Sequence, residues 1–143
     1  MPSILLHPPF LHSLAALLYV GLAGHFWHSR WRGAVLDQPV KGLVGWERSW
    51  LAIALLIHGL TLAQEIFPAD GSGMRFGFSV ALSMMTWLAV ALYWIESFYA
   101  RMEGLQMLGL PLAAICGLLP WLLPGQHLIA NAGSPMFRLH FLM

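Results

Sequence analysis

The second long apolar stretch of the sequence carries polar residues along one face. His58, Thr61 and Glu65 stand at positions i, i+3 and i+7, a spacing that places side chains on the same side of a helix. Imidazole and carboxylate groups are costly inside hydrocarbon, so they face protein or a cavity and often mark function. This stripe is therefore the first candidate for chemistry in the chain.

Two interpretations of the stripe stay open. In the structural one, His58 is buried, and its ring is satisfied by a carbonyl of a neighbouring helix or by Ser83 or Thr86 of the next apolar stretch. In the functional one, His58 ligates heme or belongs to a proton relay, because imidazole binds iron and exchanges protons near neutral pH. A relay through His58, Thr61 and Glu65 would suit a proton- or ion-coupled transport component.

The first apolar stretch holds two further histidines. His12 and His25 are 13 residues apart, a spacing similar to that of membrane cytochromes that stack two hemes between facing helices. Such a cytochrome needs a matching pair on the second helix, which offers only His58. We therefore do not expect a diheme cytochrome b, and we interpret His7, His12 and His28 as interfacial residues.

Two more histidines follow the fourth apolar stretch. His127 stands alone, whereas His140 stands two residues after Arg138 and follows the helix breaker Ser134-Pro135. A ring nitrogen of an exposed imidazole can ligate heme iron, and a nearby guanidinium can pair with a heme propionate. On residue type alone, an ordinary interfacial histidine is the favoured interpretation of His140.

The composition requires lipid as the solvent for much of the surface. Of 143 residues, 59% are hydrophobic and 9% charged, with a mean hydropathy of +0.71, whereas soluble domains carry about 25% charged residues. The net charge of +1 argues against nucleic acid as a partner, because binding it takes a clustered basic patch. Cys116 is the one cysteine, so disulfides and cysteine metal sites within one chain are excluded.

Four apolar stretches meet the length of a membrane span, which is about 20 residues and at least about 17. We expect these helices at about residues 10–27, 50–67, 76–98 and 105–123, and the start of a fifth segment at 136–143. No internal repeat or linker divides the chain. The sequence thus predicts an all-α, polytopic transmembrane helix bundle that forms a single domain over residues 1–143.

Basic residues in the loops set the expected orientation. One side of the bundle carries five of them, namely Arg30, Arg32, Lys41, Arg48 and Arg101. The other side carries Arg75 and Arg138. The side richer in Lys and Arg faces the cytoplasm, so the N-terminus, the turn at Asp70 and the segment after the fourth helix face outward. In a bacterium this means an inner-membrane protein whose N-terminus is periplasmic.

The tryptophans agree with this frame. Those that bracket the first loop suit the headgroup level, where an indole is half in lipid and half in water; they are Trp27, Trp31, Trp46 and Trp50. Trp87 stands in the middle of the third stretch instead. We expect it to pack against a partner helix or a flat ligand.

The order of these features resembles the cytochrome c assembly protein family. The similarity is to the CcsA-like heme-handling membrane proteins, and within them to the HemX/YpjD-like inner-membrane branch. It is carried by residues 53–60 around His58, by 81–97 with the link at 103–106, and by 137–140. The resemblance covers the whole chain, but about the first half of a typical member.

The resemblance implies a role in cytochrome c biogenesis. The chain would hold or pass heme near the periplasmic face, with His140 as an axial ligand of the heme iron, Arg138 as a propionate partner and His127 as a weaker candidate. His58 matches a helix-borne histidine of the branch, whose role stays open. The family's tryptophan-rich heme segment would lie beyond Met143, which suggests a truncated gene or fragment. The implied partners are heme, apocytochrome c and other maturation proteins.

Catalysis by this chain is not expected. The sequence contains no nucleophile–base arrangement, phosphate loop or paired-carboxylate site, and Gly71 and Gly73 serve a turn. Besides heme handling, two alternatives remain: the transport component with its pathway along His58 and Glu65, and a non-catalytic membrane anchor that recruits partners through apolar helix faces.

Overall fold

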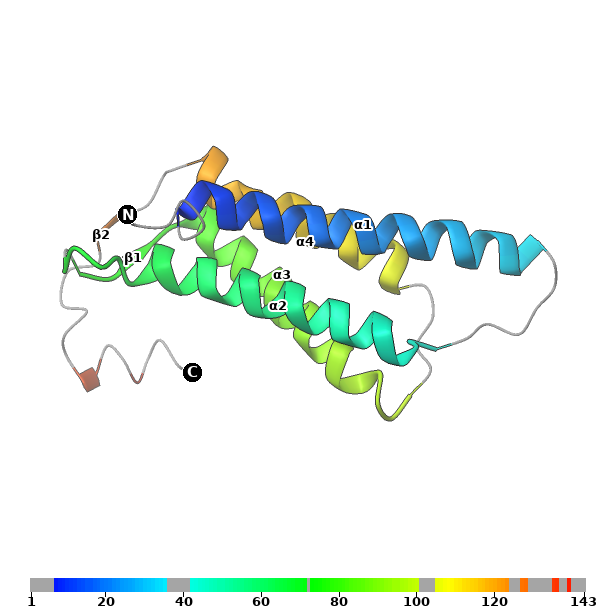
Figure 1. The fold of residues 1–143 in the computed structure, drawn as a ribbon. Helices are drawn as coiled ribbons and strands as arrows, with labels where there is room; N and C mark the ends of the chain where they lie inside the picture. The colour runs from blue at the N-terminus through cyan, green and yellow to red at the C-terminus, as the bar shows by residue number, and fades with distance from the viewer. Residues whose placement is uncertain are drawn as a thin grey trace.

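The described part of the chain forms four helices that run side by side in the computed structural model (Figure 1). The structure describes residues 7–35, 42–71, 73–100, 105–123, 127–128, 135–136 and 139. The helices are α1 (Pro8–Val35), α2 (Gly45–Ile66), α3 (Phe78–Glu96) and α4 (Leu105–Leu122). Two short strands, β1 (Arg75–Phe76) and β2 (His127–Leu128), pair antiparallel, with Arg75 opposite Leu128 and Phe76 opposite His127.

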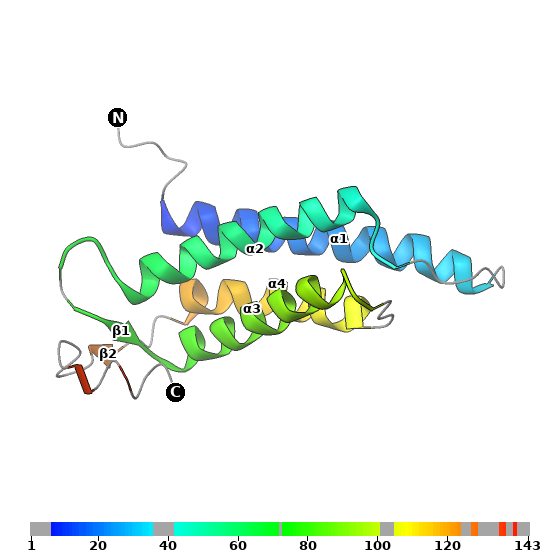
Figure 2. The same cartoon turned by 90° about the horizontal axis from the view of Figure 1, so that it is seen from below.

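The helices alternate in direction, so their termini collect at two ends of the bundle (Figures 1 and 2). One end, called the strand end below, holds the start of α1, the end of α2, the start of α3, the end of α4 and the β1–β2 pair. The opposite end, called the Glu47 end, holds the other helix termini. The main contacts form a ring, because α1 and α3 each pack against both α2 and α4.

Three of these helices are long and apolar enough to cross a membrane. The qualifying segments are Pro9–Arg30, Gly45–Ile66 and Phe78–Glu96. The apolar segment of α4, Gln106–Leu122, is shorter. The prediction of long apolar helices is thus confirmed for the first three, and α4 is an apolar helix at the expected place. The expected fifth segment at 136–143 falls almost wholly outside the described residues.

α1 and α2 are longer than predicted from the apolar stretches, because each helix also includes polar residues. α1 continues past Trp27 to Val35 because the residues that follow include helix formers and no proline. α2 begins at Gly45, before Trp50, because the Glu47 carboxylate accepts a hydrogen bond of 2.8 Å from the Val44 amide. That bond satisfies one of the free N–H groups at the helix start.

The core of the bundle is largely apolar, as in a water-soluble protein, but burial differs in two respects. Polar side chains lie inside the bundle, among them His12, Glu47, His58, Thr61, Ser83 and Gln106. Large apolar side chains point outward, such as Leu56 at 74% and Leu108 at 79% exposure. Soluble proteins keep such groups inside and polar groups outside. The arrangement fits a lipid surrounding, in which apolar outer surface costs nothing and polar groups pair within the protein.

α2 and α3 approach closely at Gly59, on which the Trp87 indole lies. Nε1 of Trp87 donates a hydrogen bond of 2.8 Å to the Leu55 carbonyl. A Cβ atom at position 59 would lie 3.2 Å from the ring, closer than ordinary van der Waals contact. Trp87 was expected to pack against a partner helix or a flat ligand, and in the structure it packs against the helix α2.

We expect Gly59→Ala to destabilise the protein by about 1–3 kcal/mol, because the methyl group would press against a hydrogen-bonded, rigid ring. The measurement is the unfolding midpoint in detergent, followed by tryptophan fluorescence. Gly24→Ala is the matched control, since a Cβ there meets nothing within 4 Å and alanine favours the helix. An equal loss of stability in both variants would contradict the close contact.

Candidate functional site

His58 lies in the middle of α2 with both ring nitrogens hydrogen-bonded. Nδ1 is 3.2 Å from the hydroxyl of Tyr19 on α1, and Nε2 is 2.9 Å from Oγ of Ser83 on α3. The Tyr19 ring meets the imidazole edge-on, with ring centroids 5.6 Å apart. The residue is 0% exposed. His58 therefore joins three helices from a wholly buried position.

This geometry bears out the structural interpretation of His58 and identifies the partner. Ser83 satisfies the ring, whereas Thr86 donates to the carbonyls of Leu82 and Ser83 within its own helix. An iron ligand needs a ring nitrogen with a free lone pair. His58 could bind heme iron only after its bond to Tyr19 or Ser83 breaks.

Thr61 shares the face of His58 but turns its hydroxyl back onto α2. Its Oγ1 donates a hydrogen bond of 2.6 Å to the His58 carbonyl. A bond of this kind satisfies a buried hydroxyl within one helix and slightly perturbs the backbone ladder. The proton of Thr61 is thus engaged locally and does not point toward Glu65.

Glu65, in the last turn of α2, pairs with His12 of α1. His12 Nε2 lies 3.2 Å from Oε1 of Glu65, and His12 Nδ1 lies 2.8 Å from the Gly117 carbonyl of α4. The side chain of His12 is 1% exposed and that of Glu65 is 19% exposed. The pair lies at the strand end of the bundle, with its carboxylate toward the outside.

Gly117 brings the two buried histidines to one wall of α4. Its carbonyl accepts the bond from His12, and a Cβ at this position would lie 3.6 Å from Nε2 of His58. Two hydrogen-bonded groups lie beside Gly117, and we call them together the polar chain: Glu65, His12 and the Gly117 carbonyl form one, and Tyr19, His58 and Ser83 form the other. The polar chain connects all four helices through side chains that lipid cannot satisfy.

The expectation that His12 is interfacial is wrong, because His12 is wholly buried. The sequence offered one signal for its place: the Glu65 carboxylate near the end of an apolar helix requires a partner, and a histidine near the start of the preceding helix can supply it. His7 and His28 are exposed.

A second polar cluster lies at the Glu47 end. The Glu47 carboxylate receives His25 Nε2 at 2.9 Å and faces the Arg30 guanidinium at 3.5 Å. Nearby, Nη2 of Arg48 donates to the Ser97 carbonyl at 2.6 Å. These contacts hold the termini of α1, α2 and α3 together at this end of the bundle. The charged groups of the cluster therefore have a structural role. His25, whose spacing from His12 is similar to that of a diheme cytochrome, belongs to this cluster.

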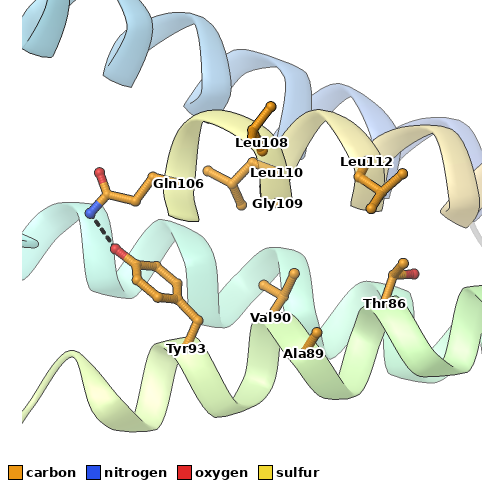
Figure 3. Close-up of a pocket in the computed structure, with 9 residues that line it drawn as sticks. All are labelled: Thr86, Ala89, Val90, Tyr93, Gln106, Leu108, Gly109, Leu110 and Leu112. Atoms are coloured by element: carbon orange, nitrogen blue, oxygen red, sulfur yellow. Dashed lines mark hydrogen bonds between the residues drawn. The ribbon is translucent and has the colours of Figure 1, made fainter. Parts of the chain in front are cut away.

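Apolar hollows lie between the helices, and the described residues line two of them. One, of about 230 Å³, lies between α3 and α4, with Tyr93 and Gln106 near one end and Leu112 and Thr86 near the other (Figure 3). Gln106 donates a hydrogen bond to the Tyr93 hydroxyl, so this polar pair is already satisfied. The other, of about 680 Å³, follows the α2–α3 contact. The side chains that line both hollows are mostly apolar.

The heme candidates near the C-terminus are mostly outside the described residues. Arg138 and His140 both fall there. For His127, the structure describes the backbone, which lies in β2 opposite Phe76, but not the side chain. Among the described residues, no group of three or more His, Cys, Asp or Glu side chains is arranged to hold a metal ion.

Comparisons of the chain with known proteins give no match. No protein-family model, no curated protein and no solved structure matches it. The functional argument therefore rests on the residues and on their arrangement.

Ser83→Ala should destabilise the protein by about 1–3 kcal/mol, because it leaves a ring nitrogen of His58 buried without a partner. Ser49→Ala is the control, since Ser49 is exposed and its hydroxyl donates to the Gly45 carbonyl within its own helix. Both variants would be compared by urea unfolding in detergent. Equal stability of the two would show that the bond between His58 and Ser83 contributes nothing.

Proposed function

We propose that this chain is an inner-membrane component of cytochrome c biogenesis that binds or passes heme at the strand end of the bundle. The resemblance to the CcsA-like heme-handling proteins motivates this function. Its main structural support is the β1–β2 pair, in which His127 lies opposite Phe76. The pairing returns the chain after α4 to the end that holds the α2–α3 turn, so the histidine of β2 belongs to the end where heme would be met.

The proposed function requires that all four helices cross the membrane. α4 has 18 residues, which at about 1.5 Å per residue give a length of about 27 Å, close to the hydrocarbon thickness of about 30 Å. It packs against α1 and α3, which supports a shared environment. With four spans, the strand end faces the periplasm, and the Glu47 end, with Arg30 and Arg48, faces the cytoplasm.

Heme handling would then use residues that follow α4. His140 would ligate the iron, Arg138 would pair with a propionate, and His127 would be a second candidate ligand. We assign His58 to the bundle interior, because both of its ring nitrogens are hydrogen-bonded. The recipient would be an apocytochrome c, and bond formation to its thiols would belong to another protein.

Reporter fusions test the orientation on which this function depends. A reporter enzyme that works only in the periplasm should be active when it is joined after Leu123 and inactive when it is joined after Gly42. A reporter that works only in the cytoplasm should give the opposite result, because the two positions lie at opposite ends of the bundle. Both fusions leave α1 intact. Activity of the Leu123 fusion in the cytoplasm would overturn the proposed site of heme handling.

Heme binding itself is tested with the full chain purified in mild detergent and titrated with heme. We expect a Soret band that His140→Ala abolishes and that Arg138→Ala weakens several-fold, because the first removes the iron ligand and the second a propionate partner. His7→Ala is the control, since His7 is an exposed histidine at the start of α1. Equal Soret bands in wild type and His140→Ala would exclude the assigned ligand.

A further inference from the structure

A long groove follows the contact between α2 and α3. The residues of α2 that line it extend from Ala52 to Phe67, and the exposed side chains of Leu56 and Phe67 show that it opens outward. At about 1.5 Å per residue this stretch is about 22 Å long, which exceeds half of a hydrocarbon thickness of about 30 Å. The groove is therefore long enough for one acyl chain of a single bilayer leaflet.

The lining of this groove suits an apolar chain. Its two indole N–H groups are engaged, because Trp87 donates to the Leu55 carbonyl at 2.8 Å and Trp94 donates to the Arg48 carbonyl at 3.0 Å. The space arises from small residues on both helices, namely Ala52, Gly59, Ala63 and Ala91. Along its length the groove thus offers apolar contact and no free side-chain donor among the described residues.

A cation lies at the Glu47 end of the groove. Arg48 stands one helix turn before Ala52, and its side chain crosses from α2 to the end of α3. There, Nη2 donates to the Ser97 carbonyl at 2.6 Å, and the guanidinium carbon lies 4.8 Å from the centre of the Phe98 ring. An apolar groove that ends at a guanidinium has the two properties that a phospholipid requires.

The positive charge of Arg48 is not paired within the described part of the chain. None of the ion pairs there includes Arg48, and its Nε is buried without a hydrogen-bond partner. The Glu47 carboxylate turns instead to α1, where it meets His25 and Arg30. One carboxylate thus faces two guanidinium groups in this cluster, so the groove ends in a net positive charge that is complementary to an anion.

The guanidinium also lies at the height of lipid headgroups if α2 and α3 cross the membrane. α2 begins at Gly45 and α3 ends at Glu96, so both helices reach the membrane surface there. Trp46 and Tyr99 are exposed at this end, and such side chains prefer the headgroup level. A planar guanidinium matches phosphate oxygens in geometry as well as in charge.

We propose that the groove between α2 and α3 binds one anionic phospholipid, whose acyl chain lies along Trp87 and Trp94 and whose phosphate pairs with Arg48. A choline or ethanolamine headgroup brings its own cation next to the phosphate, so the net positive end of the groove favours a lipid with net negative charge. The site goes beyond heme handling and requires only that α2 and α3 cross the membrane.

The first test is native mass spectrometry of the heme-free full chain in mild detergent, titrated with phosphatidylglycerol or with phosphatidylcholine of identical acyl chains. We expect one phosphatidylglycerol to bind about fivefold more tightly than phosphatidylcholine, since one basic residue near an anionic lipid contributes on that scale. Equal affinity for the two lipids would overturn the proposal.

Arg48→Gln should remove this preference, because it deletes the cation at the end of the groove. Arg32→Gln is the matched control, since Arg32 is an exposed basic residue in the last turn of α1 and does not line the groove. The same loss in both variants would show that net charge alone attracts the lipid, which contradicts the assigned site.

The position of the acyl chain is tested in wild type with phosphatidylglycerol that carries a photoreactive diazirine in its chain. We expect the cross-links on α2 and α3 at residues that line the groove, among them Ala63 and Met84. Cross-links spread evenly over the outer faces of α1 and α4 would exclude a specific site. This measurement decides even if Arg48→Gln does not fold.

A variant that fills the groove distinguishes a lipid from a second copy of the chain. Ala63→Phe should weaken phosphatidylglycerol binding several-fold, because Ala63 lines the groove. Leu17→Phe, at an exposed position on α1 outside the groove, should leave binding unchanged. A dimer that Ala63→Phe dissociates would assign the groove to a second copy and refute the lipid. Neither variant touches the residues proposed to handle heme.

Discussion

Lipid offers no hydrogen-bond partner, so each polar group that a helix carries into the membrane must find its partner within the protein. The polar chain follows from this constraint. His58 reaches Tyr19 and Ser83 on two other helices, and His12 reaches Glu65 and the Gly117 carbonyl. Since directed bonds of this kind have few satisfactory geometries, they fix which helices are neighbours and at what height they meet.

Close backbone approach makes these bonds possible. The Gly117 carbonyl of α4 accepts the bond from His12, and Gly59 admits the Trp87 indole between α2 and α3. Small residues allow helices to approach in a membrane, where apolar burial supplies little driving force between them. Other large apolar side chains lie outward, as Leu56 and Leu108 do, while Tyr19 and Phe26 belong to the buried core.

The two ends of the bundle use polar groups differently. At the Glu47 end, Glu47 gathers the Val44 amide, His25 and Arg30, which is a structural fastening of helix termini. At the strand end, a partly exposed carboxylate leads to a buried histidine, and β2 brings the chain after α4 alongside β1. Each end thus pairs a carboxylate with a histidine, and the more exposed partner is His25 at the Glu47 end and Glu65 at the strand end.

The sequence by itself determined the helices, because hydropathy and the cost of unpaired backbone in lipid act on each segment alone. It also determined that His58 needs a partner such as Ser83, since spacing within a helix shows which residues share a face. The tertiary structure alone decided that His12 belongs to Glu65 and not to the interface, and that β2 returns to β1. Those facts depend on which helices become neighbours and on the height at which they meet, and no local pattern contains that information.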